Sequence, residues 1–185
     1  MAAIVRSPVR NIVLQHVEDV AVLAGSRRVL LSAPNVKLLH LARADERLAA
    51  HVDGMIEAGA TGARLCAAAL ESPSPGAVFA AAALALHDRD TDRLLQLIAL
   101  AAASPELQQG LLAAFEWADP PQLAGVVARL LESKVPIVRA MGIAACGAHR
   151  VDPGLIARRC LDDPDPALRS RALRTAGEQI GRAHV

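Results

Sequence analysis

Four prolines recur along the second part of the chain at almost constant spacing. Successive members lie 30, 31 and 30 residues apart, and each stands five residues after a leucine: Pro75, Pro105, Pro136 and Pro166. Proline favours the first turn of a helix, where its missing N–H would have no partner, and it pushes the preceding residue out of the helical conformation. Each proline therefore predicts a joint between two helices. Two helices in a period of about 30 residues indicate an α-solenoid of stacked helix pairs.

The composition favours the same all-α fold. Apolar residues make up 53% of the chain, yet aromatic residues make up only 2% and tyrosine is missing. The core must therefore come from Ala, Leu, Val and Ile, a mixture that suits closely packed helices. We expect a single domain over residues 1–185, with an irregular helical N-terminal cap in residues 1–60 and repeats in residues 61–182.

Some elements can be placed in more detail. In the cap, two helical stretches are expected over residues 11–25 and 42–70, joined by "SAPNVKLL". Near the other end, "DDPDPALRSRALRTAG" (162–177) predicts a helix that begins at Pro166. Its buried stripe is expected to hold Leu168, Ala172, Leu173 and Ala176. Gly177, like Gly147 one unit earlier, is expected to allow close contact between helices.

Charge and cysteine content argue against several classes of protein. The formal net charge is +1 and the basic residues are almost all arginine, so a nucleic-acid binder, which normally has a basic excess, is disfavoured. The three cysteines, Cys66, Cys146 and Cys160, are widely spaced and predict small core residues in a reducing compartment. The N-terminus has no signal-peptide pattern, and the longest apolar run, residues 77–86, is about half a bilayer crossing. We expect a cytoplasmic protein without a membrane partner.

No catalytic or cofactor motif is found in the sequence. Cys146 and His149 could face one another across a helical turn, but two ligands do not make a metal site. The stretch "AGATGARL" lacks the lysine of a phosphate-binding loop, and acidic pairs such as Asp45–Glu46 are typical of solvated helix surfaces. We therefore expect no enzymatic activity, no cofactor and no metal.

The repeated stretch resembles the HEAT-repeat class, in its short bacterial form. The pattern D-x-D-P-x-L-R-x-x-A-L is strong over 161–177, good over 131–148, and present in outline in the two earlier units. In that class the Asp and the following Arg form ladders between repeats. The resemblance implies such a structural ladder here, involving Asp162 or Asp163 with Arg169, together with Arg139 at the equivalent position.

A more specific resemblance covers about residues 11–182. The stretches "LARADERLAAHVDGMIEAG", "VFAAAALAL", "AFEW", "AHRVDPG" and "RALRTAGEQIGR" are similar, in that order, to an uncharacterised proteobacterial HEAT-like family. Its members are often encoded beside type VI secretion genes and are generally longer than this chain. Because the sequence stops at "GRAHV", after the first helix of its last unit, we expect a short form or fragment, or a partner that covers the last apolar face.

Two groups of residues are candidates for binding a partner. Phe115 and Trp117 could anchor a partner, or they could fill a gap between units. Arg129, Arg158 and Arg159 fall on the second helices of successive units, which are expected to line the concave side. They could bind an acidic surface, or they could pair internally with Glu132, Asp162 or Asp163.

These observations lead to one expected function and to alternatives. We expect a non-catalytic protein–protein interaction scaffold that holds a partner on its concave face, as an accessory, adaptor or immunity-type protein of a type VI secretion cluster. One alternative is a homodimeric assembly module. HEAT-like DNA-repair glycosylases and chromophore lyases offer DNA-binding or enzymatic alternatives, although a charge of +1 and three aromatic residues suit neither.

Overall fold

The structure is a computed structural model that describes residues 7–180, and within this range every regular element is an α-helix. The elements are α1 (Arg10–Ser32), α2 (Leu38–Glu57), α3 (Ala60–Ala69), α4 (Pro75–His87), α5 (Thr91–Ala101), α6 (Pro105–Trp117), α7 (Pro120–Leu123), α8 (Val126–Leu131), α9 (Pro136–Ala148), α10 (Gly154–Cys160) and α11 (Pro166–Ile180). The "GRAHV" stretch and residues 1–6 of the N-terminus lie outside the described residues. The all-α prediction is confirmed.

The four periodic prolines each begin a helix, as predicted. They are the first residues of α4, α6, α9 and α11. Three of these helices carry a side-chain cap before the proline: Ser74 accepts a hydrogen bond from the N–H of Ala77, Ser104 from that of Leu107, and Asp165 from that of Leu168. Serine or aspartate at the N-cap and proline next to it together fix the helix start.

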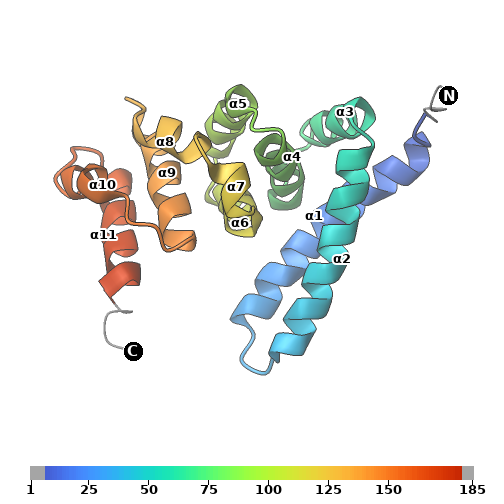
Figure 1. Ribbon diagram of the computed structural model, residues 1–185, viewed down its shortest axis with the longest axis horizontal. Helices are drawn as coiled ribbons and strands as arrows, with labels where there is room; N and C mark the ends of the chain where they lie inside the picture. The colour runs from blue at the N-terminus through green and yellow to red at the C-terminus, as the bar shows by residue number, and fades with distance from the viewer. Residues whose placement is uncertain (1–6, 181–185) are drawn as a thin grey trace.

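Successive helix pairs lie side by side along the chain (Figure 1). The proline-started helices form one row, in which α4 packs on α6, α6 on α9, and α9 on α11. The helices α5, α8 and α10 follow them as second members of the pairs and occupy the upper edge in Figure 1. Helix α4 is apolar on all sides, and residues 77–86 are all buried, as expected for a helix surrounded by neighbours.

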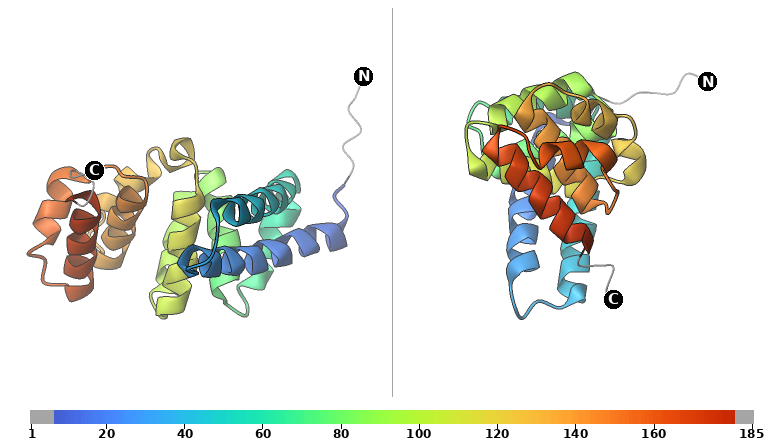
Figure 2. Two further views of the ribbon diagram at one scale, coloured as in Figure 1. Left: turned by 90° about the horizontal axis from the view of Figure 1, so that it is seen from below. Right: turned by 90° about the vertical axis from the view of Figure 1, so that its left-hand side faces the viewer.

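The N-terminal region differs from the sequence expectation in two ways. The first helix does not stop near Gly25 but continues to Ser32, and the stretch 42–70 is divided into α2 and α3. The division falls at Gly59, whose φ of 53° is the left-handed conformation that favours glycine after a helix. Helices α1 and α2 form a long hairpin that projects from the other helices in the end-on view of Figure 2. Residues 25–47 contain no buried side chain.

The arginine positions of the repeat are structural. The Arg139 guanidinium donates to the Asp163 carboxylate at 2.7 Å, whereas Arg169 donates to the backbone carbonyls of Asp163 and Pro164 at 2.7 and 3.0 Å. Asp163 therefore connects two successive units. Asp162, the other aspartate proposed for this ladder, is exposed and makes no hydrogen bond or ion pair within the described part of the chain.

Two details of the α11 prediction are wrong. Leu168 and Ala172 are fully buried as expected, but Leu173 is 61% exposed and Ala176 is only half-buried, whereas Thr175 is buried. Gly177 has open space around it, whereas Gly147 does lie against Thr175 and Glu178 of α11. Helices α9 and α10 both pack on one side of α11 and cover only a narrow stripe of it, which explains why the predicted stripe is too wide.

Candidate protein-binding groove

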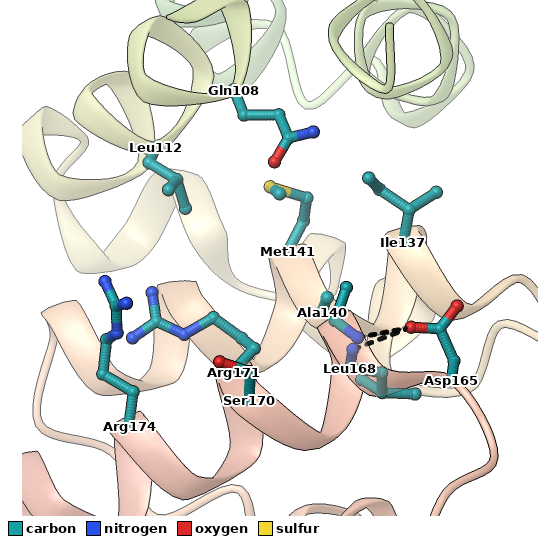
Figure 3. Close-up of a pocket in the computed structure, with 11 residues that line it drawn as sticks. Gln108, Leu112, Ile137, Ala140, Met141, Asp165, Leu168, Ser170, Arg171 and Arg174 are labelled. Carbon is teal, nitrogen blue, oxygen red and sulfur yellow. Dashed lines mark hydrogen bonds between the residues drawn. The ribbon is translucent and has the colours of Figure 1, made fainter. Parts of the chain in front are cut away.

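A cavity of about 320 Å³ lies between α6, α9 and α11. Figure 3 shows Gln108 and Leu112 on the α6 side and two arginines, Arg171 and Arg174, that extend from α11 toward Leu112. Helix α9 contributes apolar side chains, among them Met141. The cavity is therefore a depression with an apolar floor and a polar wall on α11, where Asp165 accompanies the two arginines.

Arg171 is the most constrained polar group in this cavity. Its side chain is only 17% exposed, and one guanidinium nitrogen contacts Glu178 at 3.2 Å. Its Nε is buried without a hydrogen-bond partner. Burial lowers the pKa of the Arg171 guanidinium, and Glu178 partly offsets that effect. Arg171 therefore keeps its charge in a partly desolvated place with unused hydrogen-bonding capacity.

Arg174 lies one turn further along the same face of α11. Residues three apart on a helix are neighbours, and the positive charge of Arg174 lowers the pKa of Arg171 further. Arg174 is exposed and has no ion pair with any residue that the structure describes. The charges of Glu178 and Glu116 both act on Arg171, and Asp165 lines the same cavity.

A second cavity of about 300 Å³ lies between α1, α4 and α6, on the other side of Leu112. Leu112 lines both cavities, which therefore lie next to each other on α6. Arg27 and Arg28 of α1 line the far wall of the second cavity, and Glu116 of α6 lines the same cavity. We call this surface the arginine groove, defined by Arg27, Arg28, Leu112, Met141, Arg171 and Arg174.

The α1 wall is held in place by polar contacts. Arg27 Nε contacts Asp45 Oδ1 at 2.8 Å, and the Arg27 guanidinium lies 5.5 Å from the centre of the Trp117 ring. Arg28 donates to the Gln109 side-chain oxygen at 2.8 Å. The Arg28 charge is thus met by a neutral amide, which leaves it able to attract an anion.

Phe115 and Trp117 fill a gap between helices. Phe115 is fully buried, so it offers no surface to a partner. Trp117 is half-buried and packs edge-on against Phe79, with ring centres 6.5 Å apart. Of the two interpretations of this aromatic pair, the structure favours the one in which it joins α6 to α1 and α4.

The three second-helix arginines are exposed, as the partner-binding hypothesis requires. Arg129 on α8 has only a distant contact with Asp92, at 3.9 Å. Arg158 and Arg159 on α10 make no ion pair in the part of the chain that the structure describes. None of the three pairs with Glu132, Asp162 or Asp163, but all lie outside both cavities of the arginine groove.

The three cysteines are buried and form no disulfide with one another. Burial raises the pKa of Cys66 to about 11 and also raises the pKa values of Cys146 and Cys160, so these thiols stay protonated at neutral pH. His149 Nε2 forms a hydrogen bond with the Phe115 carbonyl at 2.6 Å. No group of three potential metal ligands occurs among the described residues, and no described helix is long and apolar enough to cross a membrane.

The sequence hypothesis missed the arginines of the groove. Arg171 and Arg174 stand three residues apart in the predicted last helix, which is a usable signal that they share a face. The α1 wall could not be predicted from the sequence, because Arg27 and Arg28 belong to the cap, which has no repeat register. Comparison of the chain with protein-family models, with curated proteins and with solved structures gave no match.

Proposed function

We propose that this chain is a cytoplasmic, non-catalytic interaction scaffold, a HEAT-like solenoid that holds a protein partner in the arginine groove. The observation that carries the proposal is the cavity between α6, α9 and α11, which has apolar side chains such as Met141 and, on its α11 side, Arg171 and the exposed Arg174. Exposed arginine beside apolar surface is typical of protein-binding sites. The proposal moves the binding face from the second helices to the row of α6, α9 and α11.

We further propose that the partner belongs to a type VI secretion cluster, with this chain as an accessory, adaptor or immunity-type protein. This part rests on the family resemblance of the stretches such as "VFAAAALAL" and "RALRTAGEQIGR". Affinity purification from a native strain is expected to yield an effector, spike or sheath component together with this chain. Purification that yields none of these would contradict the secretion assignment.

The binding face is tested by co-expressing the chain with the products of its neighbouring genes and measuring the mass of the complex by light scattering. The variant with Arg171→Glu and Arg174→Glu is expected to lose the partner. The matched control with Arg158→Glu and Arg159→Glu changes charge equally on α10 and is expected to keep it. Loss of the partner with the α10 variant and not with the α11 variant would place the partner on the second helices. A homodimer that binds no partner would favour the self-assembly alternative.

A further inference from the structure

We propose that the tip of the α1–α2 hairpin binds the surface of an anionic lipid bilayer. The hairpin tip is defined here as residues 29–43, which comprise the end of α1, the turn and the start of α2. In the end-on view of Figure 2 this tip lies beyond the ends of the other helices. The inference departs from the sequence-based expectation of no membrane partner, and it does not depend on the arginine groove.

Large apolar side chains are exposed at the hairpin tip. Four of them have more than half of their surface accessible to solvent, namely Val29, Leu31, Leu38 and Leu39, and the exposed fraction of Leu38 is 84%. Exposed apolar groups gathered in one place mark an interaction site. Residues 25–47 contain no buried side chain, so no described part of this chain covers the tip.

These side chains project in several directions around the tip. Neighbouring positions on a helix are rotated by about 100°, so Leu38 and Leu39 project to different sides of α2. Val29 and Leu31 are about 200° apart on α1 and project to nearly opposite sides. A groove on another protein would cover one side of the hairpin, whereas a bilayer that is entered end-on surrounds the tip on every side. The distribution of apolar residues therefore favours a lipid surface.

The charge of the tip selects an anionic surface. Residues 20–44 contain no aspartate or glutamate, and their basic members are Arg27, Arg28, Lys37 and Arg43. The first two belong to the arginine groove, where carboxylates accompany them. Lys37 and Arg43 lie nearer the turn and make no ion pair with any residue that the structure describes. Basic residues beside exposed apolar ones are typical of segments that bind anionic lipids.

The nearest carboxylates lie on the side of the tip that faces the other helices. Asp45 and Glu46 follow Arg43 along α2, further from the turn, and Asp45 is already paired with Arg27. A bilayer that meets the turn end-on therefore contacts Lys37 and Arg43 before it reaches a negative side chain.

The spacing of leucine and arginine along α2 fits the depth of a membrane interface. At a rise of about 1.5 Å per residue, Arg43 lies about 7.5 Å from Leu38 along the helix. Segments that bind at an interface bury their apolar side chains by about 5–10 Å. Leu38 and Leu39 can therefore lie below the headgroups while Arg43 lies at their level. The long side chain of Lys37 can extend from the turn to the same level.

The end of α1 is closed by hydrogen bonds within the hairpin. The Ser32 hydroxyl donates to the Val29 carbonyl at 3.0 Å, and the Ala33 N–H donates to the Leu30 carbonyl at 3.4 Å. Polar groups that are already bonded cost less to transfer into a region with little water. These bonds therefore lower the cost of placing the turn among lipid headgroups.

A second copy of this chain is a poorer occupant. In a symmetric contact the same surface of both copies meets itself, so Lys37 and Arg43 of one tip would face the same cations of the other. No carboxylate within residues 20–44 is present to offset that repulsion. Anionic headgroups supply the opposite charge directly.

The test is flotation of the full chain with vesicles made of equal parts of phosphatidylglycerol and phosphatidylcholine. We expect the chain to float with these vesicles and not with vesicles of phosphatidylcholine alone. Introducing Lys37→Glu with Arg43→Glu is expected to weaken binding by roughly 30-fold or more. The matched control with Arg158→Glu and Arg159→Glu changes the charge equally on α10 and should alter binding by less than about twofold.

A second pair of variants tests the apolar part of the tip. Leu38→Ser with Leu39→Ser should weaken vesicle binding by roughly tenfold. Both leucines are exposed in the first turn of α2, so the helical circular dichroism should not change. The matched control replaces two exposed leucines elsewhere, Leu155→Ser with Leu173→Ser, and should leave vesicle binding unchanged.

Insertion of the tip can be followed by fluorescence. The chain has a single tryptophan, Trp117 on α6, whose emission should not change when vesicles are added. Leu38→Trp places a second tryptophan at the tip. Its emission should shift to shorter wavelength with anionic vesicles, because the ring moves out of water.

Several outcomes would overturn the inference. One is failure to float with anionic vesicles, and another is flotation that both tip variants leave unchanged, because binding would then occur elsewhere. Equal binding to neutral vesicles would remove the anionic surface as the occupant. A homodimer that ignores vesicles and is dissociated by Leu38→Ser with Leu39→Ser would assign the tip to a second copy.

Discussion

Helix α4 and helix α11 both begin at a periodic proline, yet they are held in place differently. Helix α4 is enclosed, with residues 77–86 all buried. Helix α11 touches its neighbours along a stripe formed by Leu168, Ala172 and Thr175, while Leu173 on the same helix is 61% exposed. The centre of the molecule is thus packed on all sides, and the C-terminal end is packed on one side.

The two regions also differ in the kind of contact. Around α4, backbones approach so closely that a Cβ added at Gly76 or Gly110 would overlap the carbonyl oxygen of Ala21 or Pro75, respectively. At α11, a small core is supplemented by the bond between Arg139 and Asp163. Close packing of helix backbones thus stabilises the centre, whereas polar contacts contribute to stability at the C-terminal end. One face of α11 is left uncovered there, and the arginine groove lies on that side.

The largest expected effect is that of adding one methyl group at the centre. Gly110→Ala places a Cβ against the Pro75 carbonyl, so α6 must move from α4, and the free energy of unfolding should fall by about 3 kcal/mol or more. Gly177→Ala is the matched control on α11, where the space is open, and it should raise stability by up to about 1 kcal/mol. Urea denaturation measures both, and equal losses would contradict the contrast.

The second prediction concerns the core of the C-terminal end. Leu168→Ala removes a fully buried side chain from a cluster with few members, and it should cost about 3 kcal/mol. Leu173→Ala, five residues later on the exposed side, should change stability by less than about 0.5 kcal/mol. If the two variants melt at the same temperature, the stripe assigned to α11 is wrong.

The third prediction is a loss of stability at alkaline pH that comes chiefly from ionisation of Cys66 in the central core. Burial raises the pKa of Cys66 from 9.0 to about 11. The unfolded thiol therefore loses its proton at a lower pH than the folded one. The free energy of unfolding therefore keeps its full value below pH 9 and falls by about 2 to 3 kcal/mol as the pH rises to 11.

This window is favourable for measurement, because the chain has no tyrosine and only two lysines, Lys37 and Lys134. Denaturation with urea between pH 8 and 11 should show the decline, and Cys66→Ala should flatten most of it. Cys160→Ala should flatten less, because Arg139 partly offsets the effect of burial on the pKa of that thiol. A decline that both variants leave unchanged would rule out the cysteines as its source.

The smallest expected effect tests the polar contact between units. Asp163→Asn removes the charge opposite Arg139, whose side chain is only 22% exposed, and should cost about 2 kcal/mol. Asp162→Asn is the neighbouring control and should cost less than about 0.5 kcal/mol. Thermal unfolding monitored by circular dichroism compares the two variants. A greater loss of stability for Asp162→Asn would show that Asp162, and not Asp163, connects the two units.

The sequence predicted the features that depend on the local backbone and missed those that depend on packing against a neighbouring helix. The starts of α4, α6, α9 and α11 were predictable because proline acts on its own backbone. The exposure of Leu173 was not predictable, because it depends on how much of α11 the neighbouring helices α9 and α10 cover. The two cavities of the arginine groove combine α6 with α1 on one side and with α9 and α11 on the other, and no repeat register relates the cap to the last unit.

The central claim is that the face formed by α1, α6, α9 and α11 binds the partner. Hydrogen exchange of the full chain, measured with and without the protein partner that co-purifies with it, tests this claim without any substitution. We expect slower exchange confined to these four helices, with α8 and α10 unchanged. Protection of α8 and α10 around Arg129, Arg158 and Arg159, with the groove helices unchanged, would contradict the account.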